Sequence, residues 1–208
     1  IEDKEVYRFN PNIENPKEEV YIELSEDANY FDFDENDNMY LGDRDGVCVV
    51  TPEKTETYTG YHEDIAIKQV RVFDGYVYVN SNKTIYKNQI LDNSGSLGES
   101  QVVVDLESTS KYKSADIGSF DIDVNGMIIL CLKNVPDNSI FVLENDGSIT
   151  PYYKLKIMPS SVDQVVYGRS RYVYLNRGIT LSGVTTTDLV KVYKMGMQYT
   201  GAPYWGRE

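Results

Sequence analysis

The chain has 208 residues and a formal net charge of −13, with 41% hydrophobic and 25% charged residues, which is typical of a globular protein. The negative balance argues against binding to nucleic acid and to anionic membrane surfaces, because proteins of those classes carry a basic surface. No apolar run approaches the roughly 20 residues of a membrane-spanning helix, so the sequence predicts no transmembrane segment.

The negative charge is concentrated in the first third of the chain. Residues 1–64 hold 19 Asp and Glu against five Lys and Arg, whereas the remaining residues are close to neutral. Solvated loops explain such a bias, and so would a cation site or a basic partner. The first residue is Ile rather than Met and no signal peptide is present, so we expect a processed or truncated product.

Short runs rich in Val, Ile, Tyr and Phe alternate with turn residues from one end of the chain to the other. This pattern predicts antiparallel strands joined by hairpins. Residues 5–25 predict two strands, which resemble the second half of a four-stranded meander. Four longer units follow, and each predicts a meander of its own, at approximately 28–65, 66–106, 116–157 and 162–200.

One aromatic or aliphatic residue in the second strand of each unit gives the register of the repeat: Tyr40, Tyr78, Ile129 and Tyr174. The separations are 38, 51 and 45 residues, which matches the period of about 40–50 residues of propeller blades. Successive meanders bury their faces by stacking, so the pattern favours a β-propeller over an irregular β-sandwich, the alternative. We therefore predict an all-β fold and one β-propeller-like domain over residues 1–208.

The predicted propeller is partial. Residues 5–25 supply only half a blade, and the residues after Tyr193 are too few and too rich in Gly and Pro to supply the other half. Natural β proteins avoid such open edges. We therefore expect Val6–Phe9 to lie at a sheet edge or to pair outside this chain, with an upstream domain or a second chain completing the fold.

Two dipeptides predict tight hairpin turns. Asn125-Gly126 and Asp74-Gly75 each combine a residue that tolerates positive φ with a glycine, as a type I′ turn requires. We expect both glycines to have positive φ, since glycine has no Cβ to clash there.

The acidic run at residues 32–37 allows a calcium interpretation. Asp32, Asp34 and Asn36 occupy the first, third and fifth positions of a calcium-binding loop, but the Gly expected at the sixth and the Glu at the twelfth are missing. A similar run from Asp121 also fails at the twelfth position. Both runs fall where the repeat needs a turn, which explains Asp and Asn without metal. We predict no metal ligand and no cofactor, with calcium at the first run left open.

Sequence motifs for catalysis are missing. There is no Gly-rich phosphate loop, no Gly-x-Ser-x-Gly elbow and no Cys/His pair at a meaningful spacing. The single histidine, His62, severely limits Ser-His-Asp and multi-histidine metal chemistry. Cys48 and Cys131 lie in strand-like runs, and we favour buried free thiols over a disulfide.

The form Phe-Asp-x-Asp-x-Asn-Gly-x-x-x-Leu at Phe120–Leu130 resembles NHL-type repeats and gluconolactonase-like six-bladed propellers. The tail at residues 201–208 resembles the end of bacterial surface lipoproteins in which an IPT/TIG domain precedes an NHL-type propeller. These resemblances imply an exported, non-enzymatic protein of the periplasm or cell surface. A gluconolactonase-like protein would instead be a metal-dependent lactonase-like hydrolase, whose site would gather carboxylates and an Asn from several blades at the centre.

Tyr204 and Trp205 are the candidate ligand-binding residues. An exposed Tyr-Trp pair can stack on a sugar ring or anchor a protein partner. The alternative is that the tail packs its aromatic rings against the last blade. We therefore expect a binding or structural module with a protein or glycan partner, and the hydrolase is the alternative function.

Overall fold

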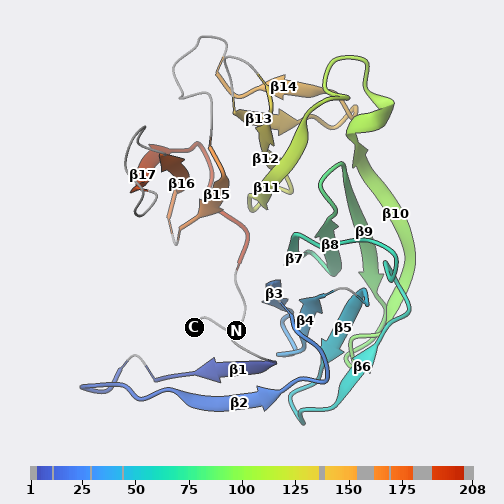
Figure 1. Cartoon of the computed structure of the whole chain (residues 1–208), viewed down its shortest axis with the longest axis vertical. Coiled ribbons are helices and arrows are strands. Elements are labelled where there is room, and N and C mark those ends of the chain that lie inside the picture. Colours follow the sequence, from blue (N-terminus) through green and yellow to red (C-terminus); the bar gives the residue numbers. More distant parts are fainter. Residues whose placement is uncertain are drawn as a thin grey trace.

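The computed structural model describes residues 4–10, 12–28, 30–43, 45–135, 139–153, 162–168, 170–179 and 189–203. These residues form an all-β protein of five antiparallel sheets that succeed one another around an arc (Figure 1). One short 3-10 helix, η1 (Leu106–Ser108), is the only helix in the described part of the chain. The all-β, partial-propeller fold predicted from the sequence is confirmed.

The sheets follow chain order, and neighbouring strands within each sheet are consecutive in the sequence. The first sheet contains β1 (Glu5–Arg8) and β2 (Glu19–Glu23). The second contains β3 (Tyr30–Phe33), β4 (Met39–Gly42), β5 (Val47–Val50) and β6 (Glu56–Tyr58). The third contains β7 (Gln69–Phe73), β8 (Tyr76–Asn80), β9 (Thr84–Ile90) and β10 (Leu97–Asp105). The fourth contains β11 (Asp116–Ile122), β12 (Ile128–Lys133), β13 (Ile140–Leu143) and β14 (Ile149–Pro151). The fifth contains β15 (Gln164–Tyr167), β16 (Tyr172–Ile179) and β17 (Leu189–Gly196).

The first strands of the four larger sheets, β3, β7, β11 and β15, lie on the inner side of the arc (Figure 1). β3 contacts β7, β7 contacts β11, and β11 contacts β15. The last strands, β6, β10 and β14, lie on the outer side. Polar side chains carried by the inner strands are thereby brought together at the centre, although they are far apart in the sequence.

The hydrophobic core is a series of interfaces between neighbouring sheets. Successive side chains of a strand point to opposite faces, so one face packs on the preceding sheet and the other on the following one. At one interface, Tyr40 and Val49 of the second sheet pack with Val70 and Val77 of the third. Equivalent clusters fill the other three interfaces between successive sheets. This is how a propeller buries sheets that cannot bury themselves.

The two predicted glycine turns have different geometries. Asp74 and Gly75 join β7 to β8 with φ of 49° and 73°, so both lie in the left-handed region and the tight turn is confirmed. At the other turn Gly126 has φ of 82°, but Asn125 is not among the described residues with positive φ. The predicted hairpin turn and the positive φ of Gly126 are therefore confirmed, but the turn is not of type I′. The Gly126 N–H donates to the Asp123 carbonyl, which gives a type I turn closed by a glycine bulge.

β10 begins at Leu97 and pairs with β9. After β17, Gly201 forms a β-bridge with Asp123, and the Ala202 N–H donates to the Ile122 carbonyl at 2.8 Å. The chain therefore returns to the inner edge of β11, because a free row of backbone groups is available there.

Candidate binding cavity on the turn face

A cavity of about 800 Å³ lies where the β3–β4, β7–β8 and β11–β12 turns meet the loop between β9 and β10. We call this side of the molecule the turn face. The lining comes from residues 34–36, 72–76, 90–93 and 124–126, with Tyr78, Lys87 and Pro203. Cavities of this size accommodate small molecules or a few side chains of a partner.

The two acidic turns on the turn face are built by carboxylates that accept backbone hydrogen bonds. Asp34 Oδ1 accepts the N–H groups of Asn36 and Asn38, each at 2.9 Å. Asp123 Oδ1 accepts those of Asn125 and Met127 at 2.8 and 2.9 Å. In both turns the carboxylate replaces a backbone acceptor and fixes the chain reversal. These side chains therefore shape the rim of the cavity.

Aromatic side chains form one wall of the cavity. Tyr76 and Tyr78 project from the same face of β8, with ring centroids 6.4 Å apart. Lys87 places its Nζ 4.7 Å from the centre of the Tyr76 ring. Burial, together with the charge of Asp74 and the neighbouring Tyr76, raises the pKa of Tyr78 above its usual value, so its hydroxyl stays protonated and can donate a hydrogen bond.

The rim of the cavity is acidic. Glu35 and Asp74 are exposed on it, and Asp92 is held by the hydroxyls of Ser94 and Ser96. These hydrogen bonds lower the pKa of Asp92 to about 2. With Lys87 the only basic residue of the lining, the cavity favours neutral or cationic ligands over anionic ones.

Three buried charged side chains, Asp32, Arg71 and Asp121, link the second, third and fourth sheets, and we call them the charged row. Arg71 on β7 reaches Asp32 on β3 through Nη1 and Asp121 on β11 through Nε, the latter at 2.9 Å. The exposed fractions of Asp32, Arg71 and Asp121 are 4%, 3% and 0%. Asp32 also accepts the Val72 N–H at 2.9 Å, and Asp121 accepts the Tyr167 N–H at 2.7 Å. Each aspartate therefore binds the backbone of the sheet that follows its own.

The charged row bears on both metal hypotheses. Asp32 and Asp34 belong to one acidic run, but Asp32 binds Arg71 whereas Asp34 folds its own turn. The carboxylates of Asp32 and Asp121 do gather at the centre from different sheets, and the positive charge between them is a guanidinium. Among the described residues, no group of three or more His, Cys, Asp or Glu side chains is placed to hold a metal ion.

The structure leaves the predicted aromatic pair untested. Tyr204 and Trp205 lie outside the described residues. Pro203, the residue before them, lines the cavity. Sequence reasoning missed the wall formed by Tyr76 and Tyr78, although their spacing of two residues in a strand already placed both on one face.

The remaining candidates are structural. Cys48 and Cys131 are buried free thiols, as predicted, and burial raises the pKa of each to about 12, so neither is a ready nucleophile. His62 Nε2 lies 3.0 Å from Asn88 Oδ1, and burial lowers its pKa. The imidazole stacks obliquely on Tyr86, with ring centroids 4.8 Å apart, so it is held away from the cavity lining.

Comparison with known proteins establishes the fold alone. No family model and no curated protein sequence matches the chain. Among solved structures, a luciferin-regenerating enzyme matches with a TM-score of 0.70 and 12% identity, over 97% of this chain and 74% of that one. A protein assigned as a gluconolactonase matches with a TM-score of 0.68 and 12% identity, over 97% and 70%.

A third match has a different context. The extracellular domain of a one-component system from B. thetaiotaomicron gives a TM-score of 0.53 at 11% identity, over 96% of this chain and 24% of that one. The likeness to gluconolactonase-like propellers predicted from the sequence is thus confirmed at the level of fold. The described part of the chain contains no helix with the length and apolar character needed to cross a bilayer.

Proposed function

We propose that the chain is a non-enzymatic binding or structural module that binds a protein or glycan partner in the cavity on the turn face. The lining of that cavity carries the proposal: Tyr76 and Tyr78 stand beside exposed carboxylates and the amides of Asn36 and Asn125. Aromatic faces cover the apolar side of a sugar ring or of a partner's side chain, while amides and carboxylates accept and donate hydrogen bonds at its edges.

We further propose an extracytoplasmic location, at the cell surface or in the periplasm. The extracellular domain of a sensor protein among the structural neighbours supports this location, as does the resemblance of the tail to surface lipoproteins. The tail itself lies largely outside the described residues, so the lipoprotein assignment stays a prediction.

The alternative, a metal-dependent lactonase-like hydrolase, draws on the likeness to a neighbour assigned as a gluconolactonase. The contacts of Asp32 and Asp121 weigh against it, because both carboxylates bind Arg71 and the backbone of the next sheet. Recruiting them to a metal would leave a buried guanidinium without its partners, which is costly.

The cavity proposal is tested by screening the protein on a glycan array and titrating the oligosaccharides that bind, in parallel with cross-linking to surface proteins. Tyr76→Ala should weaken the binding found by about tenfold or more, because the ring supplies a large apolar contact. Tyr199→Ala is the matched control, since Tyr199 is 44% exposed and does not line the cavity. Equal binding by wild type and Tyr76→Ala would refute the cavity as the site.

We also propose that a partner completes the arc, whether an upstream domain or a second chain. The first sheet has two described strands and the last has three, while the sheets between them have four.

A further inference from the structure

One residue position shows that the last sheet lacks a neighbour. Three second-strand residues occupy equivalent positions: Tyr40 pairs with Asp32, Tyr78 with Arg71, and Ile129 with Asp121. Each of the three packs into the interface with the following sheet. Tyr174 holds the same position, opposite Val166, but 40% of it is exposed. In three sheets this position packs against the following sheet, whereas in the last sheet it faces solvent.

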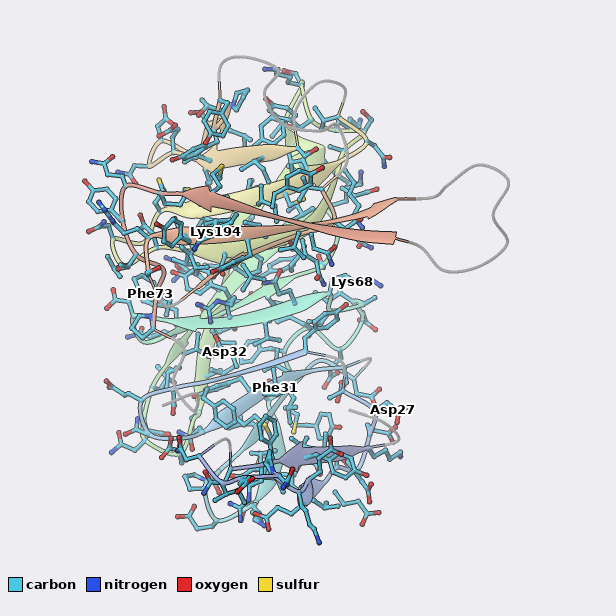
Figure 2. All side chains as sticks on the ribbon, turned by 90° about the vertical axis from the view of Figure 1, so that its left-hand side faces the viewer. Asp27, Phe31, Asp32, Lys68, Phe73 and Lys194 are labelled. Carbon is cyan, nitrogen blue, oxygen red and sulfur yellow. The ribbon has the colours of Figure 1, made fainter. Side chains whose placement is uncertain are left out.

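The exposed face of the last sheet extends beyond this one residue. Val166, Tyr172 and Val192 are 38%, 41% and 64% exposed, and they alternate along their strands with Val173 and other residues buried against the preceding sheet. Lys194 lies on the same face, with its Nζ 3.8 Å from the centre of the Tyr172 ring. Figure 2 shows Lys194 on β17 at the front of the molecule.

The other end of the arc has the complementary face. Val6 and Ile22 of the first sheet are buried against the second sheet, whereas Tyr7 and Val20, on the opposite face, are 44% and 47% exposed. Within the described residues, β1 pairs with β2 only. One end thus presents the face that normally packs on a following sheet, and the other the face that packs on a preceding sheet. A sheet of the same kind fits both.

The size of the missing part follows from the structural neighbours. Residues 1–208 contain 17 described strands and span 74% and 70% of the chains of two neighbours. At the same density of strands, those chains hold about 23 and 24 strands, which corresponds to six four-stranded blades. About seven strands are then needed to close a ring of six blades, and the chains of both neighbours extend beyond the part that this chain matches.

The topology decides where in the polypeptide these strands belong. After β17 the chain turns inward and residues 200–202 bind the inner edge of β11, so it does not continue into a fourth strand of the last sheet. In every described sheet, paired strands are consecutive. The strand that covers the second edge of β1 should therefore immediately precede β1.

We propose that sequence encoded upstream of residue 1 completes the ring. In chain order it supplies the outer strand of the last sheet, one complete four-stranded sheet, and the two inner strands of the sheet that ends with β1 and β2. The inference rests on the completion of the arc proposed above and is independent of the cavity, so a failed cavity test leaves it standing. The new sheet buries Tyr174 on one side and Tyr7 on the other.

The test compares residues 1–208 with a product extended by about 80 residues of the encoded upstream sequence, the length of seven strands. Tyr174→Lys should lower the melting temperature of the extended protein by about 5–10 °C, because it places a charge in a buried interface. The same change should have little effect in residues 1–208. Tyr199→Lys, at a similarly exposed residue outside β15, β16 and β17, is the control.

Hydrogen exchange of the unsubstituted proteins provides a second test, which does not depend on whether the lysine variant folds. Amides of β1 and β17 should exchange at least tenfold more slowly in the extended protein than in residues 1–208, because their free edges become paired. Unchanged exchange on extension would overturn the proposal. So would a stable dimer of residues 1–208 that Tyr174→Lys dissociates, since a second copy would then be the partner that covers this face.

Discussion

The two acidic turns on the turn face, residues 32–38 and 121–127, use the same chemistry in sheets that lie two apart along the arc. In each, the first aspartate, Asp32 or Asp121, binds Arg71 and the backbone of the next sheet. The second aspartate, Asp34 or Asp123, accepts two backbone N–H groups of its own turn. One carboxylate therefore joins sheets and the other folds the hairpin.

The two turns differ at the residue in the left-handed conformation. Asp37 has φ of 61° in the first turn, and Gly126 has φ of 82° in the second. The backbone hydrogen bonds are otherwise equivalent, since the N–H of each of these residues donates to the carbonyl of the capping aspartate. The pair of aspartates thus defines the turn, and the glycine that marks it in the sequence is replaceable.

The largest effect should come from Arg71, which serves both turns. Arg71→Met leaves Asp32 and Asp121 buried without their common cation, so we expect unfolding to become easier by about 3–5 kcal/mol. Urea denaturation followed by circular dichroism measures the change. Arg8→Met, at an exposed ion pair with Glu19, is the control and should cost less than about 1 kcal/mol. Equal costs for the two variants would show that the central row does not stabilise the fold.

The next largest effects should come from the two aspartates that bind Arg71, and Asp121→Asn should destabilise the fold more than Asp32→Asn. Both oxygens of Asp121 accept N–H groups, from Arg71 and Ile122 on Oδ1 and from Tyr167 on Oδ2. In either orientation, the amide of an Asn at residue 121 would point its NH₂ at one of these N–H donors. Asp121→Asn should therefore lower the free energy of unfolding by about 2–4 kcal/mol.

Asp32→Asn should cost less. The contacts to Arg71 and Val72 both use Oδ2, and Oδ1 accepts the local Phe33 N–H. The amide oxygen of an Asn at residue 32 can keep the position that binds both Arg71 and Val72, and the NH₂ then faces the local Phe33 N–H. Urea titrations of both variants decide the order, and a larger loss for Asp32→Asn would contradict the distinction drawn between the two oxygens.

The sequence predicted the turns more readily than the links between sheets. A Gly or Asn at a hairpin is a local signal, because the left-handed conformation depends on one residue and its immediate neighbours. The period of the second-strand residues likewise gave the stacked sheets. In the charged row, Asp32 and Arg71 are 39 residues apart in the sequence, and Arg71 and Asp121 are 50 apart. No local sequence pattern pairs residues at such separations. The cavity was missed for the same reason, since its lining comes from three sheets.

A smaller effect tests whether the glycine is replaceable. Since Asp37 adopts the left-handed region in the first turn, Gly126→Asp should cost only about 0.5–1 kcal/mol. A Cβ at residue 126 would meet only Phe73, at an ordinary 3.5 Å, so sterics add little. Gly126→Val should cost more, because a β-branched residue is strained at positive φ. Thermal melts of the two variants give the comparison, and equal melting temperatures would contradict it.

The smallest expected effect is that of calcium. A metal bound at Asp32 and Asp34 would have to displace Arg71 and Val72 from the first carboxylate and the turn N–H groups from the second. Those donors are bound within the fold, so a cation gains little by replacing them. A ligand that binds only the folded state raises its stability by an amount that grows with the logarithm of ligand concentration over Kd. We therefore expect melting temperatures in millimolar calcium and in chelator to agree within about 1 °C. A rise of several degrees with calcium that disappears in Asp32→Asn would show that the first turn holds a cation. It would also show that the two acidic turns, alike in their hydrogen bonds, differ in what they bind.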